Sequence, residues 1–278
     1  MLRTRIITAL VLLGLLIPAL FYLSQAHWAL LVAAFIGVGA WEWGALLRWS
    51  EARRRLLGVI VAAACAGVSL IAPEAIGAGN STAYAAPWVM AVYFLAALFW
   101  CLLIPVWLRT RWALGTGAAG LLTGLVVLFP TWLAMVQLRI PGPAILLALF
   151  AVVWMADVAA YFSGKAFGKH KLAPSISPGK TWEGAIGAVV GVIVYGLTIR
   201  LTTGYAPLAL PLWVLALILV TAVSIIGDLY ESMLKRQAGI KDSSNVLPGH
   251  GGVLDRIDSL TSTMPIVALL WLITSGAQ

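Results

Sequence analysis

Residues Leu208–Leu229 read LALPLWVLALILVTAVSIIGDL, an apolar run whose only charged residue is Asp228, close to its end. A helix needs about 20 largely apolar residues to cross the hydrocarbon core of a bilayer, and this run is long enough. The whole chain has the same character, since its 278 residues are 62% hydrophobic and only 10% charged, with a mean hydropathy of +1.00. Soluble domains typically carry about 25% charged residues. The sequence therefore predicts an all-α polytopic membrane protein without a separate soluble domain.

Nine runs of this kind occur along the chain. They are Ile6–Leu23, Trp28–Leu47, Leu56–Ala72, Pro87–Leu108, Trp112–Val136, Ala144–Phe162, Ala185–Leu201, Leu208–Leu229 and Val253–Ile273. The positive-inside rule tests this count, because cytoplasmic loops collect Lys and Arg. With the N-terminus in the cytoplasm, all of the 18 basic residues except Arg139 and Arg200 fall on the cytoplasmic side. We therefore expect about nine transmembrane helices, with the N-terminus cytoplasmic and the C-terminus outside.

This topology accounts for the formal net charge of +8 without nucleic-acid binding. An alternative interpretation of the first run is a signal peptide. Arg3 and Arg5 precede the run, and the sequence SQA, which ends at Ala26, resembles a cleavage site. Eight further spans favour an uncleaved first helix. The sequence NST at 80–82 matches a glycosylation acceptor, and a chance match is the better interpretation in so short a loop.

Charge is distributed unevenly between the two halves of the chain. All six lysines lie between Lys165 and Lys241, and seven of the ten acidic residues lie between Asp157 and Asp258. Ionisable side chains are costly in a membrane and usually mark function. We therefore expect residues 1–140 to form a membrane scaffold of about five helices. Residues 141–278 are expected to form a catalytic half of about four helices with cytoplasmic loops.

Acidic residues lie at the cytoplasmic ends of four predicted helices in the second half. They are Asp157, Glu183, Asp228, Glu231, Asp255 and Asp258. Asp228 and Glu231 are three residues apart, so they share one helix face. Ser232 and Lys235 continue that face one turn further on. If the four helices are neighbours, their carboxylates meet in one cavity.

The type of ligand in this cavity indicates a hard metal ion. Oxygen ligands without a cluster of Cys or His favour Mg²⁺ or a similar cation. A cation would also relieve Asp228 and Glu231 at a helix C-terminus, where the helix dipole disfavours negative charge. We expect Asp228 and Asp255 to hold the metal, with Glu231 and Asp157 as further ligands or beside them. The alternative is that each carboxylate pairs with a nearby Lys or Arg, which we favour for Asp258.

The sequence PGHGG at 248–252 forms a turn that leads into the last predicted helix. Gly251 and Gly252 allow the backbone to approach an anion, and the start of a helix supplies free amides. His250 is expected to contact or orient a phosphate group, with a structural role in the turn as the alternative.

A second cytoplasmic loop, Ser163–Glu183, contains the sequence GKT that ends at Thr181. This resembles the end of a P-loop, but Pro174 stands where a P-loop has glycine, and the flanks are membrane helices. We therefore exclude a P-loop. Lys180 and Thr181 remain candidates for binding anionic groups, whereas other lysines of the loop suit anionic lipid headgroups.

The order of KR at 235–236, KD at 241–242, PGHGG at 248–252 and DRID at 255–258 resembles the motif of the phosphatidate cytidylyltransferase family, also called CDP-diacylglycerol synthases. The resemblance extends upstream through GDLYES at 227–232, ISPGKTWEG at 176–184 and DVAAYFSGKAFGK at 157–169. It covers the C-terminal half of the chain. One departure is Gly179, where the S-P-K-K-T run of the family has a lysine, while Lys180 is kept.

The resemblance implies an enzyme that makes CDP-diacylglycerol and pyrophosphate from CTP and phosphatidic acid, with Mg²⁺ and room for a second cation. The residues expected to be catalytic are Asp228, Asp255, Lys235, Arg236 and Lys180. Those expected to bind substrate are Lys241, Arg256, His250, Gly251, Gly252, Thr181 and Ser232. The expected location is the cell inner (plasma) membrane, among membrane lipids, with the site facing the cytoplasm. The resemblance is also compatible with a homodimer.

Three other functions compete with this interpretation. A CTP-dependent lipid kinase also needs a metal and a triphosphate site, and its products distinguish it. An anion transporter usually has internal repeats and midplane site residues, whereas here the charge gathers at one face. A CDP-alcohol phosphotransferase is expected to carry a D-G-x-x-A-R core, which does not occur in the sequence.

Overall fold

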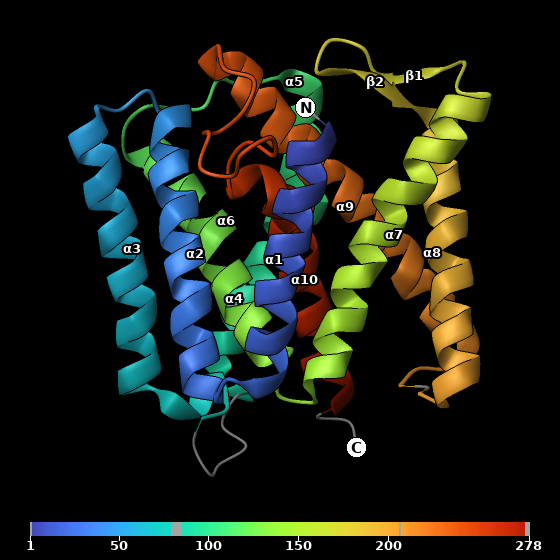
Figure 1. The fold of residues 1–278 in the computed structure, drawn as a ribbon, viewed down its shortest axis with the longest axis horizontal. Coiled ribbons are helices and arrows are strands. Elements are labelled where there is room, and N and C mark those ends of the chain that lie inside the picture. Colours follow the sequence, from blue (N-terminus) through green and yellow to red (C-terminus); the bar gives the residue numbers. More distant parts are fainter. Residues whose placement is uncertain (1, 79–84, 206, 276–278) are drawn as a thin grey trace.

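The computed structural model describes residues 2–78, 85–205 and 207–275, so the possible acceptor at 80–82 lies outside the described residues. The chain forms a bundle of long helices with a two-stranded hairpin at one end (Figure 1). The elements are α1 (Leu2–Tyr22), α2 (Gln25–Leu46), α3 (Glu51–Ile71), η1 (Pro73–Ile76), α4 (Pro87–Leu98), η3 (Phe99–Leu103), α5 (Ile104–Thr110), α6 (Ala118–Gln137), α7 (Pro143–Phe167), β1 (Lys171–Ala173), β2 (Ser177–Thr181), α8 (Trp182–Thr203), α9 (Leu210–Ala238) and α10 (Leu254–Ser275).

In the part of the chain that the structure describes, eight helices are long and apolar enough to cross a membrane, with α4, η3 and α5 forming one continuous segment. α1 contains a shorter apolar helix, Ile6–Tyr22. These segments correspond one to one to the predicted spans, which confirms the all-α polytopic membrane fold. The first and last described residues lie at opposite ends of the bundle (Figure 1), as an odd number of crossings requires. Which end faces the cytoplasm stays a prediction.

Two helix boundaries differ from the predicted ones. α6 begins at Ala118, later than the predicted start at Trp112, because the carbonyl of Trp112 accepts hydrogen bonds from the side chains of Trp107 (2.7 Å) and Gln237 (2.8 Å). α9 continues past Leu229 to Ala238, so the whole face that begins at Asp228 is helical.

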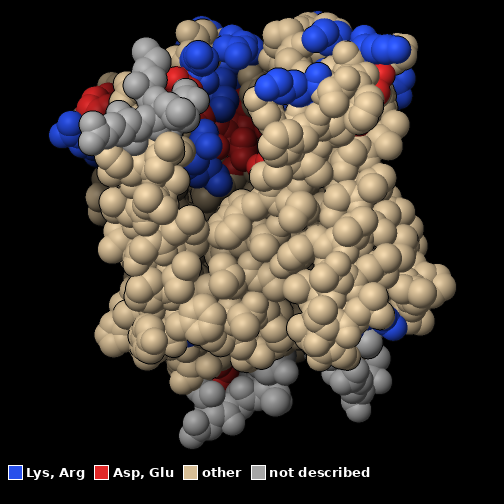
Figure 2. All heavy atoms as spheres, turned by 45° about the vertical axis from the view of Figure 1, so that its right-hand side comes forward, with Lys and Arg blue, Asp and Glu red and all other residues tan. Residues whose placement is uncertain are grey.

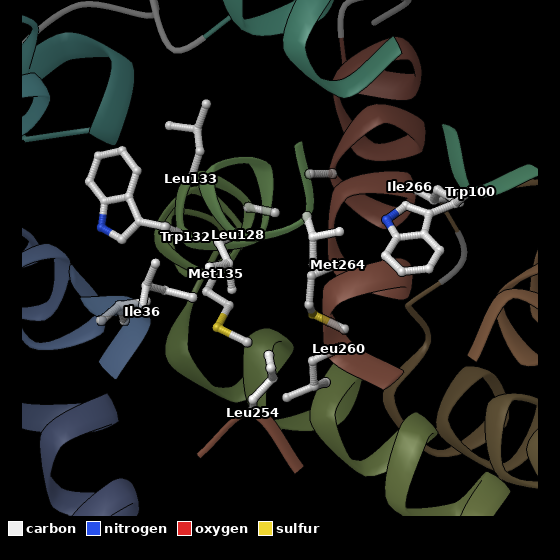
Figure 3. Close-up of a cluster of buried hydrophobic side chains, with 14 of the residues drawn as sticks. Ile36, Trp100, Leu128, Trp132, Leu133, Met135, Leu254, Leu260, Met264 and Ile266 are labelled. Carbon is white, nitrogen blue, oxygen red and sulfur yellow. The ribbon is translucent and has the colours of Figure 1, made fainter. Parts of the chain in front are cut away.

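α10 lies inside the bundle and packs against α2, α4, α6 and α9. Figure 3 shows side chains of α10, among them Leu260 and Met264, in one buried cluster with Leu128 of α6 and Ile36 of α2. Lipid tails are as apolar as these side chains, so close packing rather than hydrophobicity holds such helices together. The packing fixes the first two turns of α10 relative to α9 and α2, and these turns carry the acidic residues of the DRID sequence.

α7 and α8 pack against each other and meet the rest of the bundle mainly through α9. Their contact with α9 forms a second, smaller group of buried side chains, which we call the small apolar cluster. It consists of Val152, Ala156, Ala188, Val192, Leu217 and Val220.

The hairpin of β1 and β2 connects α7 to α8, in the loop where the sequence predicted no strands. Its strands are antiparallel, with Lys171 opposite Thr181. Thr181 also caps α8, because its hydroxyl accepts a hydrogen bond from the backbone N–H of Gly184 at 3.1 Å. Glu183, in the first turn of α8, accepts a bond from the backbone N–H of His170 at 3.2 Å. These contacts hold Lys180 at the start of α8.

Candidate active site at the charged end of the bundle

A hollow of about 500 Å³ lies between α7, α8, α9, α10 and the hairpin, and we call it the charged hollow. Asp157, Lys180 and Asp228 contribute to its lining, together with Ser224 and Ser259. Figure 2 shows Lys and Arg gathered at this end of the molecule, with acidic side chains inside a hollow that opens to the side. The charged hollow is therefore accessible both from the end of the bundle and from the flank that faces lipid.

Two aspartates from different helices line the charged hollow, and a third from another helix lies near them. Asp157 of α7 and Asp258 of α10 both lie close enough to Asp228 of α9 for their charges to interact. Lys180 forms an ion pair with Asp228, and the hydroxyl of Ser232 donates a hydrogen bond to the same carboxylate at 3.2 Å. The predicted meeting of carboxylates is therefore present for Asp157, Asp228 and Asp258, with Lys180 beside them. Glu183 does not join them, because its carboxylate contacts His170 instead.

Asp255 has different surroundings from Asp228. Its Oδ2 atom accepts hydrogen bonds from the backbone N–H (2.9 Å) and hydroxyl (2.9 Å) of Ser243 and from the backbone N–H of Gly252 (2.8 Å). Its Oδ1 atom lies 2.5 Å from Nζ of Lys235. Oδ2 of Asp255 thus holds the loop between α9 and α10, and Oδ1 ties the start of α10 to α9. Asp255 is not among the residues that line the charged hollow.

Lys235 of α9 contacts two acidic residues, of which Asp255 lies on α10 and the other on α9 itself. In addition to Asp255, its Nζ atom lies 3.0 Å from Oε1 of Glu231, one turn earlier on α9. Glu231 is buried, with 5% of its surface exposed. The predicted metal residues therefore divide into two groups, with Asp228 and Asp157 at the charged hollow and Glu231 and Asp255 around Lys235.

Glu42 of α2 is a functional candidate that sequence reasoning missed. Its side chain has no exposed surface and accepts hydrogen bonds from the backbone N–H groups of Val253 (2.9 Å) and Leu254 (2.6 Å). It accepts further bonds from the hydroxyls of Ser243 (3.1 Å) and Ser244 (2.5 Å). The only signal in the sequence was an isolated acidic residue within an apolar run. Glu42 holds the start of α10, although it belongs to the half that was predicted to be scaffold.

The glycines of the PGHGG turn are required by this packing. A Cβ atom at Gly252 would lie 2.1 Å from Oγ of Ser243 and 2.3 Å from Oε1 of Glu42. Gly251 has a φ of +80°, and a Cβ atom there would lie 2.6 Å from Oδ2 of Asp255. The structure therefore gives both glycines a packing role, and their predicted role in binding phosphate stays a prediction.

His250 is half-buried in the turn, and its backbone N–H donates to the carbonyl of Leu247 at 2.9 Å. Its Nδ1 atom is buried and has no hydrogen-bond partner among the described residues. This ring nitrogen is therefore available to form a hydrogen bond with a bound ligand.

Three predicted cations, Arg236, Lys241 and Arg256, are exposed, in contrast to Lys235. Within the described residues none of the three forms an ion pair with a carboxylate. Their charge is available to an anion that approaches the end of the bundle.

The chemistry of the charged hollow fits a hard cation. Asp157, Asp228 and Asp258 supply carboxylate oxygens, the ligands that Mg²⁺ prefers. No three His, Cys, Asp or Glu side chains in the described ranges are arranged as a finished metal site, because the oxygens face lysines or backbone donors instead. Asp255 fits a metal in this hollow less well than Asp228 does, because Asp255 is not among the residues that line the hollow and its Oδ2 atom already accepts three hydrogen bonds from the protein.

The fold and the site define an integral membrane protein with a charged hollow at one end of its helical bundle. The chain belongs to the cytidylyltransferase family, whose model matches residues 3–274. A phosphatidate cytidylyltransferase of Pseudomonas aeruginosa is 44% identical over the full length of both chains. One of Haemophilus influenzae is 32% identical over 98% of this chain and 99% of its own. One of Brucella suis is 54% identical over 45% of this chain and 44% of its own.

These similarities confirm the family that the KR, KD, PGHGG and DRID sequences indicated. They extend the resemblance from the C-terminal half to the whole chain, since the family match begins at residue 3.

Proposed function

We infer that this protein is a phosphatidate cytidylyltransferase, which transfers the cytidylyl group of CTP to phosphatidic acid and releases pyrophosphate. The observation that carries this conclusion is the hollow at one end of the membrane bundle, which contains carboxylates and a lysine and is open at its side (Figure 2). The full-length relatives of the chain bear this name. The lipid kinase and transporter alternatives have no comparable support.

The reaction needs little help with proton transfer. The second pKa of a phosphate monoester is about 6, so the phosphate of phosphatidic acid is already largely a dianion near neutral pH. One of its oxygens forms a bond to the α-phosphorus of CTP as the bond from that phosphorus to the β-phosphate oxygen breaks, and pyrophosphate leaves with the electron pair. The main obstacle is the repulsion between two polyanions, which positioned positive charge reduces.

The cations of the site are suited to this task. Lys180 lies inside the charged hollow, next to Asp228, where the two substrates would meet. Arg236, Lys241 and Arg256 are exposed at the same end of the bundle and would bind the triphosphate. Lys235 is occupied by Glu231 and Asp255, so its contribution is to hold the start of α10, which bears Arg256, against α9, which bears Arg236.

We further propose that Mg²⁺ binds at the carboxylates of Asp228 and Asp157, with Asp258 beside them and space for a second cation. When bound there, the metal would offset the charge of the triphosphate and of the departing pyrophosphate. The predicted involvement of Glu231 and Asp255 is less favoured by the geometry, because both face Lys235.

The charged end is proposed to face the cytoplasm of the cell, from the inner membrane of a bacterium. The gathering of Lys and Arg at this end supports that orientation by the positive-inside rule (Figure 2). CTP would then arrive from water, and phosphatidic acid would arrive laterally from the inner leaflet. A homodimer stays a prediction.

Isotope transfer tests the proposed function directly. Purified protein in detergent, given Mg²⁺, phosphatidic acid and CTP labelled at the α-phosphate, should form a labelled lipid, whereas CTP labelled at the γ-phosphate should not label lipid. Labelling from the γ-phosphate alone would identify a kinase instead. Absence of both labels, while a known cytidylyltransferase is active in the same detergent, would contradict the proposal.

A separate prediction concerns the exposed cations. Arg256→Gln should raise the KM for CTP about tenfold or more, because a hydrogen bond to a charged group contributes about 1.5–3 kcal/mol. Arg53→Gln, which removes an exposed arginine of α3, should leave this KM unchanged. Steady-state kinetics at several CTP concentrations measure both, and equal KM values for the two variants would exclude Arg256 from the triphosphate site.

A further inference from the structure

A second hollow, of about 620 Å³, lies deeper in the bundle, and we call it the apolar hollow. It is lined by residues of α7, α8, α9 and α10, with the segments next to them, and no charged residue belongs to its lining. Ala148 of α7, Ala216 and Leu217 of α9, and Met264 of α10 are among the lining residues. Its size is within the range of about 300–1,000 Å³ that is typical of small-molecule sites.

The same four helices line the two hollows in succession. On α9, Ser224 and Asp228 line the charged hollow, and Leu217 and Val220 line the apolar hollow. On α7, Asp157 belongs to the charged hollow, whereas residues nearer the start of the helix belong to the apolar one. The apolar hollow is therefore a continuation of the charged hollow towards the opposite end of the bundle.

A single layer of side chains separates the two hollows. This layer is the small apolar cluster, of which Ala156 and Ala188 line the charged hollow. Val152, Leu217 and Val220 of the same cluster line the apolar hollow. The members of this cluster are all aliphatic and form no ion pair, so the boundary that they provide between the two hollows is suited to contact with a hydrocarbon chain.

The near end of the apolar hollow lies at the depth that a lipid tail reaches, and the hollow continues from there to the opposite end of the bundle. Leu217 lies about 16 Å from Asp228 along α9, at a rise of about 1.5 Å per residue. One leaflet of a bilayer has a hydrocarbon thickness of about 15 Å, half of the core. A lipid with its phosphate beside Asp228 therefore places the end of its tail at the level of Leu217.

We propose that the apolar hollow holds the distal part of an acyl chain of the phosphatidic acid substrate, and that Ala148 and Ala216 set the chain length that is accepted. This inference rests on the proposed function, since it places the phosphate of that lipid in the charged hollow. An acyl chain suits the apolar hollow because its lining offers apolar surface without charge. A short acyl chain does not reach it, so the hollow acts only on long-chain substrates.

Chain-length kinetics test the inference. Ala216→Phe should lower kcat/KM for dipalmitoyl phosphatidic acid about tenfold, the range in which apolar pockets discriminate, and should leave dioctanoyl phosphatidic acid nearly unaffected. Ala222→Phe adds the same side chain to an exposed position of α9 outside both hollows and should change neither value. If Ala216→Phe has the same kcat/KM as the wild-type protein with both lipids, the inference is overturned.

Photolabelling of the wild-type protein covers the case in which the variants misfold. Phosphatidic acid with a diazirine at the end of one acyl chain should label peptides that line the apolar hollow, and dipalmitoyl phosphatidic acid should compete. Equal competition by phosphatidylcholine would show a site for bulk lipid, and absence of label with a crosslinked dimer would show that a second copy covers the hollow. Either result overturns the inference.

The two proposals fail in different ways. If CDP-lipid forms but no label enters the apolar hollow, the acyl-chain inference is wrong and the enzyme assignment stands. If phosphatidic acid competes for the label but no CDP-lipid forms, the enzyme assignment is wrong and the lipid site stands. Ala148→Phe, on the opposite wall of the hollow, should reproduce the chain-length effect of Ala216→Phe.

Discussion

Asp228→Asn should lower the turnover of CTP and phosphatidic acid by about 10²- to 10³-fold, the effect of removing one group that stabilises charge during the reaction. Asp228 lies in the charged hollow, interacts with Asp157 and Asp258, and holds Lys180 in an ion pair. Asparagine keeps the size of the side chain but removes the charge that attracts a divalent cation. Activity measured against Mg²⁺ concentration should show a higher midpoint for the variant, together with the lower maximum.

A matched control separates this effect from a general loss of charge at the same end of the bundle. Glu51→Gln neutralises another carboxylate that is ion-paired, with Arg54 at 3.1 Å, but lies on α3 away from the charged hollow. We expect wild-type turnover for it. If Asp228→Asn responds to Mg²⁺ as the wild type does, Asp228 is not a metal ligand.

The variant Asp255→Asn should behave differently from Asp228→Asn. Because one oxygen of Asp255 holds the loop before α10 and the other pairs with Lys235 of α9, its neutralisation should lower the thermal unfolding midpoint as well as activity. The Asp228 variant should unfold near the wild-type temperature. Near-wild-type stability of both variants, with equal changes in Mg²⁺ dependence, would restore the original expectation that the two residues form one metal site.

Glu42→Ala should destabilise the protein by about 2–6 kcal/mol, because it leaves two buried backbone N–H groups without an acceptor at about 1–3 kcal/mol each. Those groups belong to Val253 and Leu254 at the start of α10. Displacement of this turn moves the DRID sequence, so we expect cytidylyltransferase activity to fall with stability. Thermal unfolding in detergent and activity on the same preparation measure the two effects.

Glu42→Gln provides a graded test, since it keeps one carbonyl oxygen and places an N–H₂ group against the remaining donors. It should be intermediate in stability and activity between the wild type and Glu42→Ala. Glu51→Ala, which removes an exposed acidic residue from the same half of the chain, should unfold as the wild type does. Wild-type stability of Glu42→Ala would show that the loop finds other acceptors and that Glu42 does not position α10.

The sequence was sufficient to predict the spans, since each depends on a continuous apolar run that can be identified locally. Errors occurred where long-range contacts replace local ones. The start of α6 is one such case, because side chains from other helices bond the carbonyl of Trp112. The hairpin is another, because its strands are short and one of them ends at the residue that caps α8.

The sequence predicted which residues gather near the candidate site, but it did not predict which way their side chains face. Spacing along α9 correctly placed Asp228 and Glu231 near one another, but did not show that Glu231 turns to Lys235 while Asp228 faces the hollow. The division at residue 140 into scaffold and catalytic half stays a prediction. Glu42 shows that the first half also holds the start of α10, which carries the DRID sequence.

The sequence by itself determined that this protein crosses a membrane, that its charge gathers at one end and that it carries the motif of its family. Apolar length, charge bias and short motifs are properties of contiguous residues, so they can be recognised without a fold. Only the tertiary structure decided which carboxylates face the charged hollow, which support the turn before α10, and where an apolar hollow continues the site. These features depend on the directions of side chains from helices distant in the sequence, and packing between those helices sets the directions.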